Sequence, residues 1–314
     1  MRRGSSARLE QSLHKRKVES SILSPGKRIL IKMKKSIKSI KIGHSPDPDD
    51  AYMFYGLSKG KVSLDGYRIE HVVRDIQSLN VLAMKGRLGI TAISAAVYPL
   101  LNDKYWILST GASVGRNYGP IVVARENIKI AALKNKRIAM PGHYTTAHLL
   151  SRIFLEPFEP VFMDFTKVMA AVKKGIVEAG VVIHEGQMNY GDSGLAKVCD
   201  LGQLWHKKYR LPIPLGLDVV RKDVGRETAQ NMNSALRLSI EHAFKHPREA
   251  IGYALKFGRG ISEDVAQKFV SMYVNKDTLD LGSEGKRALK LLYRLAYEKG
   301  IYSANPKIEV IGLS

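Results

Sequence analysis

The sequence predicts an α/β fold in which most strands pair in parallel. Two features of the 314-residue chain carry this prediction. From residue 37 onward, short apolar runs of strand length alternate with longer segments whose apolar residues recur at helical spacing. Beyond Arg226 almost every segment has the helical pattern. Alternating strands and helices form βα units with parallel strands, and we expect the C-terminal helices to return and cover the first part of the chain.

The first half of the chain opens with a predicted strand that ends at Ser45, followed by a helix that begins just after Pro48. A second strand, a helix that stops at Gly86 and a third strand come next. Pro99 lies in or near a short helix that continues to Leu101. The predicted strands cover 39–45, 66–75, 88–93, 105–110 and 119–126, and the two longer helices cover 49–62 and 76–86.

The second half repeats the order of strand, loop and helix over 134–154. It then gives a helix, a break at Gly175, a strand and a loop over 168–190. A further strand is predicted over 217–223. The remaining predicted helices cover 227–246, 247–258, 262–274 and 284–300.

Composition limits the class of protein. A length of 314 residues corresponds to about two domains, and a hydrophobic fraction of 45% suits a globular core. No stretch approaches the roughly 18 apolar residues of a membrane-spanning helix. Cys199 is the one cysteine of the sequence, so an intramolecular disulfide is excluded. This fits a reducing compartment, and we expect a cytoplasmic protein, although a disulfide-free exported protein would have the same composition.

The net charge of +21 is concentrated near the N-terminus. Residues 1–40 hold twelve Lys or Arg and two Asp or Glu, a balance of +10. We expect residues 1–37 to form a disordered extension or to precede the true start of translation, for which Met33 is a candidate. The alternative is nonspecific contact of residues 1–40 with nucleic acid or anionic membranes. Zinc-finger spacing and RNA-binding aromatic signatures are lacking, so we expect no specific nucleic-acid partner.

The segment SPDPDD at residues 45–50 raises the question of a calcium loop. With Asp47 at the first loop position, Tyr52 would replace the required glycine and Ser58 the required glutamate. The segment that begins with His184 and Glu185 resembles the start of a zinc-protease helix. That motif needs a second histidine four residues after the first, and Met188 occupies this position. We therefore expect no metal site.

Three loops instead share one geometry, because each directly follows a predicted strand. They cover 45–50, 141–148 and 183–190, and the first two lead into predicted helices. Ligands of open α/β sheets bind beyond the carboxyl ends of the strands, and helix N-termini there favour anions. Ser45, Thr145 and Thr146 would add hydroxyl groups. The alternative is that these residues are ordinary helix N-caps, each contributing about 1 kcal/mol to stability.

Other polar residues near the ends of predicted elements carry the same two interpretations. His184 ends an apolar strand and is either a structural hydrogen-bond partner or a site residue. Asn80 and Ser94 lie near element ends and fit a structural role or a ligand-binding role.

Six ordered segments point to a known family, and they are SPDPDDAYMFYGL, SLNVLAMKGRLGITAISAAVY, GASVGRNYGPIVVA, PGHYTTAHLL, EAGVVIHEGQMNY and DLGQLWHKKYRLPIPLG. Together they resemble the 1,4-dihydroxy-6-naphthoate synthase family of the futalosine route to menaquinone. The resemblance runs from about Ile40 to the C-terminus. It implies a two-lobed fold like a type II periplasmic binding protein, with a ligand cleft between the lobes and a helical C-terminal region. Lobe 1 would comprise 38–122 and 217–314, lobe 2 would comprise 123–216, and GPIVVARE and LGLDVVRKD would cross between them.

The resemblance also implies an activity. Such enzymes are lyases that convert cyclic dehypoxanthine futalosine, a small anionic substrate, to 1,4-dihydroxy-6-naphthoate without a cofactor. His184 matches the histidine proposed as the general base of the family. Asn80, Ser94 and Thr146 match positions that line its cleft, with Thr145 as a neighbour and Ser45 at the start of the first loop.

The first loop departs from the usual family form, which is closer to Ser-Pro-Cys-Pro-Asn-Asp. Asp47 stands where cysteine is common and Asp49 where asparagine is common. Two added carboxylates would repel an anionic substrate unless they are neutralised, or they would bind substrate hydroxyls or structural N–H groups. The departures leave two alternatives open: a chorismate-dehydratase-like or divergent lyase on the same fold, and a solute-binding protein without catalysis.

Overall fold

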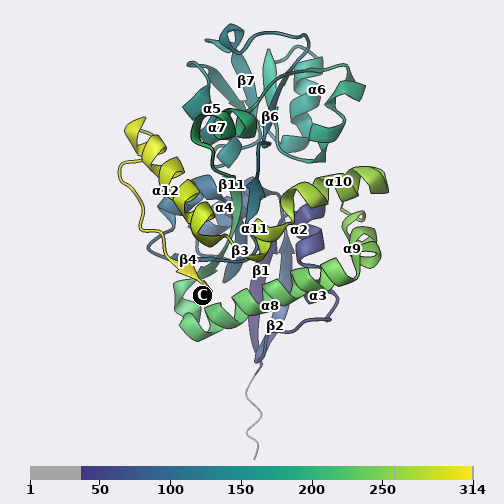
Figure 1. The fold of residues 1–314 in the computed structure, drawn as a ribbon, viewed down its shortest axis with the longest axis vertical. Coiled ribbons are helices and arrows are strands. Elements are labelled where there is room, and N and C mark those ends of the chain that lie inside the picture. Colours follow the sequence, from purple (N-terminus) through teal and green to yellow (C-terminus); the bar gives the residue numbers. More distant parts are fainter. Residues whose placement is uncertain (1–36, 258, 313–314) are drawn as a thin grey trace, which may run out of the picture. The chain divides into compact units, whose positions relative to one another are not determined.

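The computed structural model describes residues 37–257 and 259–312, which belong to one compact unit (Figure 1). The predictions for the basic extension, including the start at Met33, lie outside the described residues. Within the described part, the strands form two separate mixed sheets. We call the first sheet with the helices packed on it the first lobe, and the second sheet with its helices the second lobe.

The first sheet has the strand order β12-β4-β11-β3-β1-β2, and β5 pairs with β11 off this path. β1 runs parallel to β2 and β3, whereas β11 runs antiparallel to β3, β4 and β5. The strands are β1 (Lys38–His44), β2 (Tyr67–Val73), β3 (Ile90–Ser94), β4 (Tyr105–Leu108), β5 (Ser113–Gly115), β11 (Ile213–Arg221) and β12 (Val310–Ile311).

The second sheet has the order β10-β6-β9-β7-β8. β7 runs parallel to β8 and β9, whereas β6 runs antiparallel to β9 and β10. The strands are β6 (Ile121–Ala124), β7 (Arg137–Met140), β8 (Glu159–Phe162), β9 (Ala179–Val182) and β10 (Ala196–Asp200).

The expectation of mainly parallel pairing is therefore wrong. Half of the pairings between the described strands are antiparallel, and each of these involves β6 or β11. A βα unit returns the next strand in the same direction. β6 instead follows β5 of the other sheet directly, and β11 follows β10 of the other sheet through helix α7 (Leu201–Tyr209). Both strands enter their sheets from the opposite lobe, so no βα unit sets their direction.

The helices match the predicted order with three differences. The single helix predicted over 49–62 is divided at Phe54 into α2 and α3, and neither α7 nor α11 was predicted. The α-helices besides α7 are α2 (Pro48–Met53), α3 (Tyr55–Ser58), α4 (Ile76–Met84), α5 (Thr146–Phe154), α6 (Val168–Lys173), α8 (Arg226–Lys245), α9 (Pro247–Ala254), α10 (Glu263–Tyr273), α11 (Lys276–Leu279) and α12 (Gly282–Glu298). The short 3-10 helices are η1 (Ala95–Leu100), η2 (Ile130–Leu133), η3 (Phe165–Lys167), η4 (Glu185–Met188), η5 (Tyr190–Ser193) and η6 (Lys222–Val224).

The C-terminal helices return to the first lobe, as the sequence predicts, and α8 crosses it in Figure 1. Met232 and Leu236 of α8 are fully buried in one cluster with Ile42 of β1 and Phe54. Burial of each such side chain contributes roughly 2 kcal/mol. This packing fixes the segment SPDPDD, which forms the loop after β1 and the first residues of α2. Among the described residues, no helix combines the length and apolar character needed to cross a bilayer.

Candidate active site

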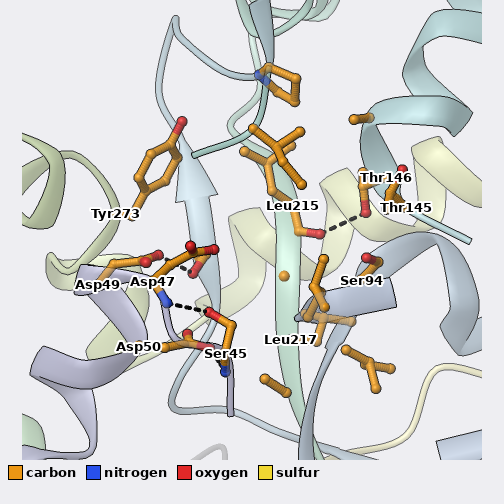
Figure 2. A pocket seen from close by; sticks show the side chains of 18 of the residues that line it. Ser45, Asp47, Asp49, Asp50, Ser94, Thr145, Thr146, Leu215, Leu217 and Tyr273 are labelled. Atoms are coloured by element: carbon orange, nitrogen blue, oxygen red, sulfur yellow. Dashed lines mark hydrogen bonds between the residues drawn. The ribbon is translucent and has the colours of Figure 1, made fainter. Parts of the chain in front are cut away.

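A cavity of about 100 Å³ lies where the loops after β1, β7 and β9 approach β3 and β11 (Figure 2). Six predicted site residues line it together. These are Ser45, Asp47, Asp49, Ser94, Thr145 and Thr146. Asn80 and His184 are not among the described residues that line it, although Ile183 and Gln187 on either side of His184 are. Among the described lining residues none is Lys or Arg, so an anionic ligand group would depend on hydroxyl and backbone N–H groups.

One side of the cavity is formed by the N-terminus of α5. Thr145 is its N-cap, and its Oγ1 accepts a hydrogen bond from His148 N at 3.2 Å. The first N–H groups of a helix have no intrahelical partner. Thr146 and Ala147 lie in this first turn and line the cavity. The helix start therefore offers the partial positive charge that favours a carboxylate.

Thr146 also joins the two lobes. Its Oγ1 donates to Leu215 O of β11 at 2.6 Å and accepts from Ala96 N of η1 at 3.2 Å. Both partners belong to the first lobe, whereas Thr146 begins α5 of the second. Because its proton is used by Leu215, the hydroxyl can offer a ligand a lone pair but not a hydrogen.

Asn80 lies behind Ser94 rather than in the cavity. Its Nδ2 donates to Ser94 Oγ at 3.1 Å and to Tyr144 O at 3.3 Å. Its Oδ1 accepts from Ser94 N at 2.8 Å. Asn80 is fully buried, so these contacts use the amide on protein groups. The arrangement makes Asn80 a residue that orients Ser94.

The other side of the cavity carries carboxyl groups from the loop after β1 and from the first turn of α2 (Figure 2). Asp50 Oδ2 accepts from Ser45 N at 2.6 Å, and Ser45 Oγ accepts from Asp47 N at 3.1 Å. Asp49 Oδ2 accepts from Ser113 Oγ at 3.4 Å. The sequence analysis named Asp47 and Asp49 but missed Asp50. Asp50 could have been found from the sequence, because it is the third aspartate of SPDPDD and lies in the first turn of α2.

Burial favours the neutral form of two carboxyl groups at the site. Desolvation raises the pKa of Asp49 well above its ordinary value, and the charges of Asp50 and Asp47 raise it further. Desolvation also raises the pKa of Asp218, which lies on β11 directly behind cavity residue Gly111. Neither oxygen of Asp218 has a hydrogen-bond partner among the described residues. A neutral acid donates a hydrogen bond and does not repel an anion.

Asp47 is neutralised in a different way. Its Oδ1 lies 2.7 Å from a guanidinium nitrogen of Arg259, in the segment between α9 and α10. The two residues are 212 positions apart, and no sequence pattern pointed to Arg259. Of the two added carboxyl groups, Asp47 is thus paired with Arg259. The neutral form of Asp49 is favoured by burial, which raises its pKa.

His184 lies just after β9 and is the N-cap of η4. Its Nδ1 accepts the backbone N–H of Gly186 at 2.9 Å, and its ring packs edge-on against Phe165. Because Nδ1 accepts this bond, the neutral ring carries its proton on Nε2. Burial lowers the pKa of His184, outweighing the neighbouring charges of Glu185 and Asp47 that raise it. The ring is therefore neutral near pH 7.

The structure has two mixed sheets joined by crossing strands, and the cavity lies between them at the strand ends. This arrangement defines the class of periplasmic-binding-protein-like folds. Comparison with solved structures supports this fold class. The periplasmic aliphatic sulphonate binding protein of Escherichia coli has a TM-score of 0.62 at 12% identity, over 86% of this chain and 90% of that one. At this identity the likeness concerns the fold alone.

The sequence comparisons identify the family. The family model for menaquinone biosynthesis matches residues 40–298, and the chain is an enzyme that belongs to this family. A 1,4-dihydroxy-6-naphthoate synthase of Thermus thermophilus is 36% identical over 271 residues, 86% of this chain and 98% of the relative. A solved protein of Archaeoglobus fulgidus has a TM-score of 0.81 at 47% identity, over 84% of this chain and 98% of that one.

Proposed function

We propose that this enzyme converts cyclic dehypoxanthine futalosine to 1,4-dihydroxy-6-naphthoate. Beside the family membership, one observation supports the proposal: six of the eight predicted site residues line a single cavity. We further propose that the reaction needs no cofactor and takes place in the cytoplasm. The lobe boundaries given above stay predictions.

The two unlike sides of the cavity suggest how the substrate is oriented. We propose that its carboxylate lies at the N-terminus of α5, near Thr145 and Thr146, where backbone N–H groups favour an anion. The hydroxyl groups of the sugar-derived portion would then face Asp49 and Asp50. A neutral Asp49 can donate a hydrogen bond to such a hydroxyl as well as accept one.

We assign the role of general base to His184. A base near neutral pH must be unprotonated, and the lowered pKa of His184 supports this. In the resting geometry the lone pair on Nδ1 accepts from Gly186 N–H. The ring must therefore release this bond to take the substrate proton at Nδ1. Glu185 Oε2 lies 3.8 Å from Nδ1 and would stabilise the imidazolium that forms.

Proton removal allows the bond to the sugar-derived portion to break, and formation of the aromatic naphthoate supplies driving force. The cavity would hold the substrate in one orientation, and this is the main contribution that we propose for the remaining residues.

The test is a direct assay of the full chain with cyclic dehypoxanthine futalosine, with the naphthoate product detected by mass and absorbance. His184→Ala should lower turnover at least about 100-fold, the lower range for general acid–base catalysis. His246→Ala, at an exposed histidine, is the matched control and should retain full turnover. Circular dichroism checks that each variant is folded.

Near-normal turnover in His184→Ala would remove this residue from the mechanism. Absence of product from folded wild-type protein would overturn the proposed reaction. It would favour a divergent lyase, or a solute-binding protein if a ligand raises the melting temperature without being consumed.

A further inference from the structure

Arg259 connects the two lobes on one side of the cavity. Its Nε donates to Glu185 Oε1 at 3.0 Å, and its NH2 nitrogen donates to Glu185 Oε2 at 2.6 Å. The same NH2 nitrogen donates to Asp47 Oδ1 at 2.7 Å. Asp47 and Arg259 belong to the first lobe, and Glu185 follows β9 of the second lobe. We call these three residues the Arg259 cluster.

The burial of Glu185 makes this contact important. Its side chain is 4% exposed, compared with 18% for Asp47 and 30% for Arg259. A buried carboxylate without a partner is strongly unfavourable, and two-pronged pairing with a guanidinium is the geometry that compensates best. When the lobes separate, Glu185 loses its partner from the first lobe and must be hydrated instead.

Arg259 also contacts the surroundings of His184. Its guanidinium lies over the Phe165 ring, 5.0 Å from the centroid, and Phe165 packs edge-on against the His184 ring at 5.4 Å. Arg259 therefore fixes both Glu185, which follows His184 in the chain, and the aromatic ring beside it. Its backbone has a φ of 53°, a left-handed conformation that a non-glycine residue keeps only when its surroundings hold it.

A second contact joins the lobes on the same side. Tyr273 OH of α10 donates to Gln187 Oε1 of η4 at 3.3 Å, and both residues line the cavity. The segment that carries Glu185 thus meets the first lobe at two points, one ionic and one neutral.

We propose that Arg259 is a positioning residue that holds the lobes together over the cavity through Glu185 and Asp47, and in doing so fixes the orientation of His184. The consequence for turnover rests on the proposed function, whereas the consequence for the lobe separation does not.

The lobe separation can be measured without substrate. Spin labels at Lys174→Cys, at the end of α6, and Lys268→Cys, on α10, report the distance between the lobes on this side, and both positions are exposed. Native Cys199 is buried and its pKa is raised to about 12 by desolvation, so it does not compete for the label. Arg259→Gln should shift the label–label distance to longer values. An unchanged distance distribution would overturn the proposal.

The matched control is Arg237→Gln. Arg237 also pairs with a glutamate, Glu241 at 3.0 Å, but within the exposed surface of α8. It should leave the distance distribution as in the wild type, and a shift equal to that of Arg259→Gln would overturn the specific role of Arg259. Asp47→Asn should give a smaller shift than Arg259→Gln, since the buried pair with Glu185 remains.

Kinetics test the effect on His184. In the full chain, Arg259→Gln should lower kcat/KM at least about tenfold, because small displacements of a reacting group are costly. Arg259→Lys, which keeps the charge but cannot pair in two-pronged fashion, should recover part of the loss. A kcat/KM equal to the wild type in Arg259→Gln would refute the positioning role. If the wild type forms no product, the proposed function fails while the distance measurement still decides on the link between the lobes.

Discussion

The neutral form of Asp49 can be tested through the pH dependence of stability. Asp49 is 8% exposed, and burial raises its pKa in the folded protein well above the value of 3.8 of a free aspartate. Above that ordinary value the unfolded chain releases the proton while the folded protein retains it. A group with a raised folded pKa thus stabilises the fold at low pH, and this contribution is lost as the pH rises toward the folded pKa.

The magnitude follows from the number of protons retained. Each proton held by the folded but not the unfolded protein lowers the free energy of unfolding by about 1.4 kcal/mol per pH unit. Between pH 5 and pH 6, the wild type should therefore lose up to about 1.4 kcal/mol more than Asp49→Asn, whose amide does not titrate. Histidines with lowered pKa values, such as His44, have the opposite slope, but they are present in both proteins and cancel in the difference.

The assay is urea unfolding of both proteins at half-unit steps from pH 5 to pH 6, followed by tryptophan fluorescence. Asp103→Asn, at an exposed aspartate between η1 and β4, is the control and should show the wild-type slope. Equal slopes for wild type and Asp49→Asn would mean that Asp49 is ionised in the folded protein. In that case the cavity would carry a charge that an anionic substrate must overcome, and the proposed orientation would be wrong.

Three further predictions concern other parts of the site. Thr146→Val leaves Leu215 O without its donor and should lower the free energy of unfolding by about 1–3 kcal/mol, measured by urea titration. Asn80→Ala removes three hydrogen bonds around Ser94 and should raise KM while lowering stability by about 2 kcal/mol or more; an unchanged KM would refute its role in orienting Ser94. Because the pKa of His184 is lowered, the base stays neutral on mild acidification, so the acidic limb of the kcat–pH profile should lie below 6.5, the ordinary histidine value. A limb above 6.5 would contradict this assignment.

The sequence by itself determined the order of most of the longer elements and the loops that carry the site. Apolar periodicity and N-cap chemistry act over a few residues, so the strand before Ser45 and the helix after Thr145 were predictable from their own segments. The placement of both loops at one cavity followed from a general property of strand ends in α/β sheets. Six segments in family-like order then indicated the fold and the family, which the comparisons confirmed.

The tertiary structure alone decided the features that depend on distant parts of the chain. The direction of β6 and β11 follows from their entry out of the opposite lobe, which local periodicity does not encode. Asn80 matched a cleft position by its sequence, yet its amide is used on Ser94 and Tyr144. The charge of Asp47 is balanced by Arg259, 212 positions away. Pairing between residues so far apart depends on the path of the whole chain, and no local pattern carries that information.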